Sequence, residues 1–183
     1  MAGLALVPAT AQTKPDSLAA KELAEIVVSG SRFASLKKNI AQPIDIINAA
    51  TIRKTNAQNM GDLLLSNGTV FVQKSQQGGS SPVIRGFEAS RVLLVIDGVR
   101  MNNAIYRSGH LQNIITVDQN MLERVELIQG PGSTLFGSDA LGGVIHLISM
   151  TPQLAAGAST EVSGHGFLRY SSANSEKTVH KDL

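Results

Sequence analysis

The stretch Glu123–Val144, with the sequence ERVELIQGPGSTLFGSDALGGV, decides the fold of this chain. Its first seven residues alternate charged and apolar side chains, which predicts a half-buried strand with Val125, Leu127 and Ile128 directed inward. Glycines then interrupt the chain before a second apolar run, which predicts a neighbouring strand over Val144–Ser149. The glycines therefore predict tight turns and a close approach of the backbone between two core strands.

A glycine-rich turn after a strand also suggests a phosphate site, and the residues exclude it. Gly132 and Gly137 have the spacing of a phosphate loop, but Ser138 and Asp139 follow where lysine and serine or threonine are required. The dinucleotide-binding pattern fails as well, because Leu135 stands in the place of its third glycine. The stretch is therefore not a nucleotide site.

Other catalytic patterns are missing from the sequence. No serine lies in a GxSxG turn, and the chain has no cysteine. Glu123 and Glu126 are three residues apart on one strand, so we expect them on opposite faces, where they cannot act as an acid and base pair. The histidines lack the spacing of a helical metal pair; they are His110, His146, His165 and His180. The sequence therefore predicts that this protein is not an enzyme.

Composition restricts the class further. The 183 residues, 43% of them hydrophobic, can supply the core of one domain. The formal net charge of +2 is small and its basic residues are scattered, which argues against a nucleic-acid partner. No run reaches the ~18 apolar residues of a spanning helix, whereas a spanning strand needs only about 10.

The N-terminal region predicts export. Residues 1–11 read as the remnant of a signal peptide, because Ala9-Thr10-Ala11 forms a small-x-small cleavage site, although a positively charged start is absent. Residues 12–31 read as a flexible segment that ends in a short β-branched run, Glu25–Ser31.

Between these ends the pattern predicts an α+β domain. Asp97-Gly98 predicts a tight turn of a hairpin, and Asp118 predicts the cap of a single helical turn through Leu122. The expected strands are Ile44–Ile47, Thr69–Gln73, Val83–Arg85, Val92–Ile96 and Val99–Met101; the expected helix is Ala49–Ser66, and Gly78–Ser81 is expected to be a loop. The tail alternates apolar residues with small or polar ones, which predicts a strand over Ser163–Ser171, a turn and the start of another strand.

Two segments carry a family resemblance. SSPVIRGFEASRVLLVIDGVRMNN (80–103) and MLERVELIQGPGSTLFGSDALGGVIHLIS (121–149) resemble the plug domain of TonB-dependent outer-membrane receptors. The resemblance covers about Glu25–Thr151. It implies a small globular plug with a mixed β-sheet and short helices over 32–151, held inside a transmembrane β-barrel. Residues 152–183 then correspond to the first barrel strand and the start of a second, so we expect a piece of a longer receptor whose own C-terminal barrel follows.

The resemblance also implies partners at the N-terminal side. Glu25, Ile26, Val27, Val28 and Ser29 are similar to the short stretch that periplasmic TonB captures by strand addition. The alternative is an ordinary first strand of the plug.

Two arginines match plug positions that face acidic residues of the barrel wall in this family. Arg85 and Arg124, with Glu123 and Glu126 beside the latter, are therefore expected to dock the plug in the barrel. The alternative is that each arginine only brackets its own turn or meets Glu123 or Glu126 locally. Both roles can hold at once, because an arginine has five donors.

The ligand is inferred from a loop. Arg107–Asn113, RSGHLQN, resembles an apical loop of the haem-uptake branch, in which His110 stands at the place of an axial iron ligand. Tyr106 and Arg107 are candidates to contact the porphyrin, and Asn102 and Asn103 begin the same ligand-binding loop. The alternative for His110 is a hydrogen bond to its neighbours.

The expected function is the gate of an outer-membrane receptor in a Gram-negative bacterium, with a periplasmic N-terminus and energy delivered by TonB. The expected ligand is haem, a haemoprotein or another iron chelate, and no cofactor is required. The alternatives are a siderophore or cobalamin receptor, or a free-standing exported binding module without a barrel.

Overall fold

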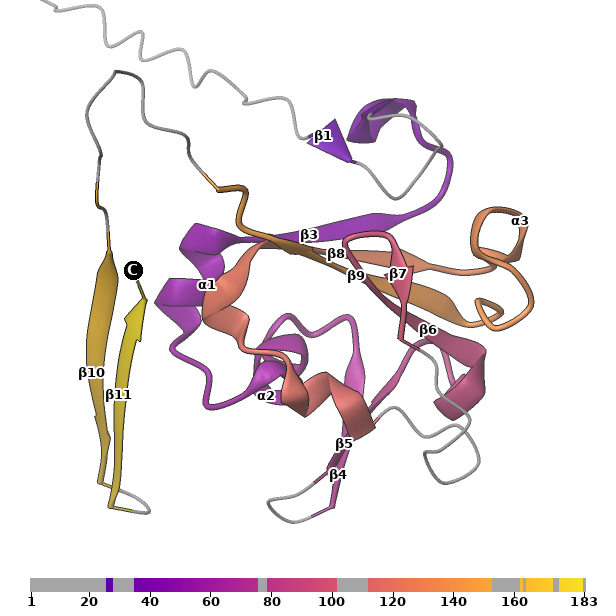
Figure 1. Cartoon of the computed structure of the whole chain (residues 1–183). Coiled ribbons are helices and arrows are strands. Elements are labelled where there is room, and N and C mark those ends of the chain that lie inside the picture. Colours follow the sequence, from indigo (N-terminus) through magenta and orange to yellow (C-terminus); the bar gives the residue numbers. More distant parts are fainter. Residues whose placement is uncertain are drawn as a thin grey trace, which may run out of the picture.

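A mixed five-stranded sheet crosses the centre of the structure, in the order β3-β8-β9-β6-β7 (Figure 1). The computed structural model describes residues 26–27, 35–75, 79–101, 112–152, 162, 164–172 and 175–182. β6 and β9 run parallel and the other neighbours run antiparallel. The five strands are β3 (Ile44–Asn48), β6 (Val92–Ile96), β7 (Val99–Arg100), β8 (Leu122–Gln129) and β9 (Gly143–Ser149). The predicted α+β class with a mixed sheet is confirmed.

The two strands of the deciding stretch pair as predicted. β8 and β9 are antiparallel neighbours, with Gln129 opposite Gly143 at the glycine-rich end. The register shifts between Leu122 and Arg124, which leaves Glu123 as the extra residue of a β-bulge. Between them the short helix α3, Ser133–Phe136, fills part of the glycine-rich turn.

The single helix predicted over Ala49–Ser66 is wrong, because two helices form there. α1 spans Ala49–Thr55 and α2 spans Met60–Ser66. Asn56 takes the left-handed conformation, with a φ of 48°, and this ends α1. The Asn59 side chain then accepts a hydrogen bond from the amide of Asp62 at 3.0 Å and starts α2. Two asparagines three residues apart thus carry the break.

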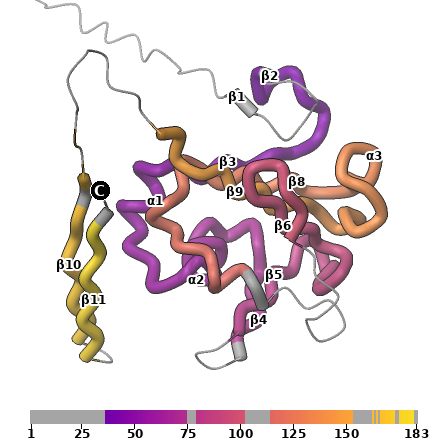
Figure 2. Tube along the Cα trace, viewed as in Figure 1, coloured from indigo at the N-terminus to yellow at the C-terminus, as the bar shows by residue number. Residues whose placement is uncertain are grey.

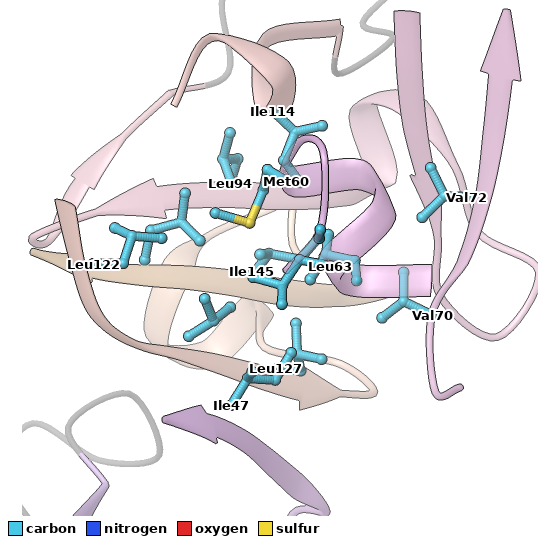
Figure 3. Packing of buried hydrophobic residues seen from close by; sticks show 14 of the residues in the cluster. Ile47, Met60, Leu63, Val70, Val72, Leu94, Ile114, Leu122, Leu127 and Ile145 are labelled. Carbon is cyan, nitrogen blue, oxygen red and sulfur yellow. The ribbon is translucent and has the colours of Figure 1, made fainter. Parts of the chain in front are cut away.

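One face of the sheet packs against α1 and α2 and holds the main core (Figure 3). Alternation along the strands supplies this face, for example through Val125 and Leu127 of β8. α2 contributes Met60, Leu63 and Leu64, which are almost fully buried. Burial of these apolar side chains stabilises the packing of the helices on the sheet.

The opposite face of the sheet has a smaller apolar cluster and a polar part. Ile44, Leu93, Ile128 and Val144 are buried there, with Ala140 from the glycine-rich turn. Ile128 is therefore buried as predicted, on the face opposite Val125 and Leu127.

The 3-10 turn η1, Lys37–Asn39, leads into β3.

A second hairpin lies beside α2. β4 (Phe71–Ser75) and β5 (Gly79–Val83) are antiparallel, and the described part of β5 is largely buried. The loop predicted over Gly78–Ser81 is therefore wrong from Gly79 onward. A Cβ placed on Gly61 would lie 2.5 Å from Ser80 Oγ, so glycine permits the close approach of α2 and β5.

Short elements complete the described chain. β1 (Ile26–Val27) pairs antiparallel with β2 (Ser35–Leu36), and β6 joins β7 through the predicted Asp97-Gly98 turn, in which both residues have positive φ. The predicted cap is confirmed as well, because Asp118 accepts from the amide of Asn120 at 2.9 Å. The remaining 3-10 turns are η2 (Ala89–Arg91), η4 (Gln112–Thr116) and η5 (Gln119–Met121).

The last two strands form a separate hairpin next to α1 (Figures 1 and 2). β10 (His165–Ser171) and β11 (Glu176–Asp182) are antiparallel, as the alternation of the tail predicts. Arg169, Glu176 and His180 are directed to the plug side, whereas the other face is exposed. Among the described residues, no helix has the length and apolar character needed to cross a membrane.

Candidate functional site

The predicted ligand loop lies outside the described residues. This applies to Asn102, Asn103, Tyr106, Arg107 and His110 alike. The structure describes both ends of this loop. Before it, the Met101 amide donates to the Leu94 carbonyl at 2.9 Å, and after it the described chain continues with η4.

Only part of the predicted TonB-binding stretch is described. Ile26 and Val27 form β1, opposite Leu36 and Ser35, while Glu25, Val28 and Ser29 lie outside the described residues. The stretch therefore contains strand structure, but its pairing is with β2 and not with the five-stranded sheet. Two residue pairs make a short contact.

Arg124 is held by two carboxylates of its own strand. Its Nη1 donates to Glu123 at 2.8 Å and its Nε to Glu126 at 2.9 Å. The Arg124 side chain is 20% exposed and that of Glu126 is fully buried. The expectation that Glu123 and Glu126 are separated on opposite faces is corrected here: the β-bulge at Glu123 interrupts the alternation, and one guanidinium contacts both. The local alternative for Arg124 is thus observed.

Beside this pair lies a buried histidine that the sequence reasoning did not assign to a site. His146 is opposite Glu126 in the β8–β9 ladder and its Nε2 accepts from the Gly98 amide at 3.2 Å. Burial lowers the pKa of His146, against the opposing effects of Glu126 and Asp97, while Arg124 lowers it further. A neutral imidazole that accepts at Nε2 carries its proton on Nδ1. The sequence does contain a signal for the burial of His146. It alternates with Val144 and Ile148 on one face of the predicted strand.

The Asp97-Gly98 turn is held by hydrogen bonds to β9. Asp97 Oδ1 accepts from the Ser149 amide at 2.9 Å, and this hydrogen bond is the main cause that lowers the pKa of Asp97. The turn is thus tied to both His146 and Ser149 of β9. Charged and polar groups therefore connect three strands on the sheet face opposite the helices.

Arg85 differs from Arg124 in every respect that matters for docking. It is exposed, and it lies in a left-handed turn with a φ of 52°, followed by Gly86 at 83°. Its Nη1 is 3.4 Å from the position of a Cβ built on Gly130. Within the described part of the chain, Arg85 has neither a hydrogen bond nor an ion pair.

The glycine-rich stretch has a packing role in the structure. A Cβ on Gly143 would lie 2.6 Å from the Ile128 carbonyl oxygen, and one on Gly142 would lie 2.3 Å from Phe87 Cβ. Asp139 forms an ion pair with Arg100 at 2.5 Å. The residues that failed as a nucleotide site thus hold β7, β8 and β9 together.

Among the residues that the structure describes, no three or more His, Asp or Glu side chains lie close enough to hold a metal ion. The candidate iron ligand, His110, belongs to the loop outside that part.

The fold and this site define a class: a small α+β plug whose sheet carries an ionic cluster on one face and whose C-terminal hairpin turns polar residues toward the plug. The chain belongs to the family described as the TonB-dependent Receptor Plug Domain, whose model matches residues 36–144. The family consists of receptors and transporters, so the chain is not an enzyme.

A curated relative extends this match. The chain is 35% identical over 162 residues to the vitamin B12 transporter BtuB of Vibrio vulnificus strain CMCP6. The match covers 85% of this chain and 26% of that transporter. The chain therefore spans about a quarter of the length of this relative.

Solved structures have the same fold. The pyoverdine outer membrane receptor FpvA from Pseudomonas aeruginosa PAO1, bound to pyoverdine, matches with a TM-score of 0.64 and 21% identity, over 80% of this chain and 20% of that one. The alcaligin outer membrane receptor FauA from Bordetella pertussis matches with a TM-score of 0.57 and 15% identity, over 70% of this chain and 22% of that one. Members of this family are proteins of the outer membrane.

Proposed function

We propose that this chain is the gate of an energised outer-membrane receptor of a Gram-negative bacterium, with its N-terminus in the periplasm and its barrel formed by the residues after the plug. The family match over residues 36–144 carries this proposal. The hairpin β10–β11 supports it, because Leu168, Tyr170 and Val179 are exposed on one face, with Lys177 and Lys181 nearer its ends, while Arg169 and Glu176 face the plug. Apolar residues outward and polar residues inward are typical of a transmembrane barrel strand.

Membrane fractionation of the full-length product tests this location. We expect it in the outer membrane, with Leu168→Asp reducing the inserted fraction because it places a charge on the lipid side. Lys181→Asp, which replaces one charge by another on the same face, is the matched control. A fully soluble exported product would favour the free-standing binding module.

The second part of the proposal is energy coupling through Glu25–Ser29. Two pairs with β2 hold Ile26 and Val27, and such a short pairing can be exchanged for the edge of a foreign sheet at small cost. Proline removes a backbone donor, so Ile26→Pro should reduce cross-linking of the full-length receptor to TonB. Ile26→Val keeps the donor and should retain it. Equal cross-linking in both variants would leave the segment a structural strand.

The third part concerns the ligand. The named relatives are a vitamin B12 transporter and receptors for pyoverdine and alcaligin, which favours a cobalamin or an iron–siderophore ligand at least as much as haem. The argument for haem rests on His110 alone. Titration of haemin, cyanocobalamin and a ferric siderophore into the full-length receptor, each with and without His110→Ala, distinguishes the three. A haemin absorption change that is lost in His110→Ala supports haem as the ligand. Saturable binding of cyanocobalamin or of the ferric siderophore that His110→Ala leaves unchanged supports that ligand instead of haem.

The fourth part assigns plug docking to Arg85. Because its guanidinium is exposed and has no partner in the described part, a carboxylate of the barrel wall is its expected partner. Arg124 has its two carboxylates already, so we expect its contribution to docking to be smaller. Arg85→Ala should increase leakage of small solutes through the receptor, whereas Arg91→Ala, an exposed arginine on η2, should not.

A further inference from the structure

The contact between the hairpin β10–β11 and the plug is made by polar groups. Arg169 Nη1 donates to the Ala57 carbonyl at 2.7 Å, and its Nη2 donates to Glu176 at 2.9 Å. Gln58 donates to the other oxygen of Glu176. One guanidinium and one carboxylate of the hairpin thus engage the turn between α1 and α2.

The plug holds its side of this contact in place. The Ala57 carbonyl also accepts from Gln119 Nε2 at 2.5 Å, and Gln119 is buried. Asn56, with its left-handed backbone, directs the chain out of α1 just before this carbonyl. The acceptor for Arg169 is therefore fixed by the plug before the hairpin adds its own hydrogen bond.

A second polar contact joins the two parts. His180 Nδ1 lies 3.5 Å from Asp118 Oδ2, and the imidazole stacks on Phe167 with ring centroids 5.2 Å apart. Asp118 is itself fixed as the cap of η5. His180 lies on β11, the strand that also carries Glu176.

The space between the hairpin and the plug is incompletely filled. A pocket of about 470 Å³ lies there, lined by apolar side chains such as Ile52, Leu122 and Phe167 and by polar ones such as Arg53 and Asn120. Protein interiors normally close such spaces, and dispersion contacts are lost where they remain open. Apolar packing therefore contributes little adhesion here, and the polar contacts carry the joint.

We propose that Arg169 is the residue that seats this hairpin on the plug, and that the turn formed by Ala57 and Gln58 is its docking surface. Arg169 and Glu176 act as one clamp, because the guanidinium bonds to the plug and to the carboxylate that Gln58 also contacts. This inference rests on the proposed function in one point: it takes the hairpin as part of the barrel of the receptor.

Gln58 offers a matched pair of variants. Its side chain is exposed on the plug, so Gln58→Glu and Gln58→Lys each place a single charge at an exposed position. Gln58→Glu opposes the carboxylate of Glu176, whereas Gln58→Lys pairs with it. In the full-length receptor, amide exchange over residues 52–63 should become roughly tenfold faster in Gln58→Glu, and unchanged or slower in Gln58→Lys.

The hairpin side is tested by Arg169→Ala. It should also accelerate exchange over residues 52–63 by roughly tenfold or more, while Lys181→Ala on the outward face leaves it unchanged. Equal exchange in Gln58→Glu, Gln58→Lys and Arg169→Ala would overturn the clamp. The measurement needs neither TonB nor a transported ligand, so it tests the clamp separately from transport. If the exchange pattern is observed but the receptor transports nothing, the clamp holds and only the proposed function is contradicted.

Discussion

The plug and its C-terminal hairpin use the same alternation of side chains in opposite senses. In the sheet of the plug, β8 turns Val125 and Leu127 into an apolar core. In the hairpin, Leu168, Tyr170 and Val179 face outward and are 81%, 66% and 75% exposed. A period of two residues therefore marks both regions as strands, but it does not tell which face meets protein. The comparison shows that the plug buries the apolar side of its strand β8, whereas the hairpin turns Leu168, Tyr170 and Val179 away from the plug.

The ion pairs of the two regions differ as well. Arg124 and Glu126 lie within the plug sheet, with Glu126 fully buried, whereas Arg169 and Glu176 lie at the joint and remain partly exposed. Arg124→Ala removes the guanidinium partner of a buried carboxylate, so we expect a loss of about 3 to 5 kcal/mol in the free energy of unfolding. Urea titration measures it. Glu123→Ala, which removes the exposed partner, should cost less than about 1 kcal/mol.

Equal losses for Arg124→Ala and Glu123→Ala would contradict the distinction between a buried and an exposed pair.

Apolar truncation compares the two regions directly. Leu127→Ala should cost about 3 kcal/mol, because it leaves a cavity in the core. Leu168→Ala should change the free energy of unfolding in solution by less than about 0.5 kcal/mol, since its side chain is exposed. A large loss for Leu168→Ala in the same titration would mean that the outward face of the hairpin packs on protein.

The glycine-rich turn is expected to be less sensitive than the core. Gly143→Ala places a methyl group 2.6 Å from the Ile128 carbonyl, and we expect a loss of about 2 kcal/mol. The hairpin counterpart is Gly166→Ala, whose methyl group lies 3.2 Å from the His180 carbonyl, so a smaller shift of the strands relieves it. Thermal unfolding of both variants checks the order, and a greater loss for Gly166→Ala would reverse it.

The smallest expected effect is a dependence of stability on pH. The folded pKa of His146 is lowered from its ordinary value of 6.5 by burial, so the unfolded chain binds a proton more readily. The free energy of unfolding is therefore highest above pH 6.5, falls as the pH drops through that value, and levels off below the folded pKa. Glu126, Asp97 and Arg124 face this group and set its charge surroundings.

His146→Gln removes this group and should flatten the dependence between pH 7 and pH 5, relative to the unsubstituted chain. Urea titrations at both pH values provide the measurement. An unchanged slope would assign the dependence to other groups.

Several elements were predictable because their signals are local. The alternation of β8, the Asp97-Gly98 turn and the Asp118 cap each depend on neighbouring residues, and each is found where the sequence predicts it. The break between α1 and α2 was missed, although Asn56 and Asn59 carry it, because an apolar period that continues on both sides outweighs two polar residues. Gly79–Ser81 of β5 were predicted to be a loop, because the burial that Gly61 permits cannot be seen in these glycine and serine residues. The strand predicted over Val83–Arg85 is wrong at its end, because Arg85 lies in a left-handed turn.

By itself, the sequence determined the family, the mixed α+β class and the exclusion of nucleotide chemistry, since these follow from residue types at fixed spacing. The tertiary structure alone decided which charges meet. The bulge at Glu123 gives Arg124 two carboxylates, the β8–β9 register places His146 beside Glu126, and the fold brings Arg169 to Ala57 across 112 residues of chain. Register and long-range approach depend on the whole packed chain, and no local pattern encodes them.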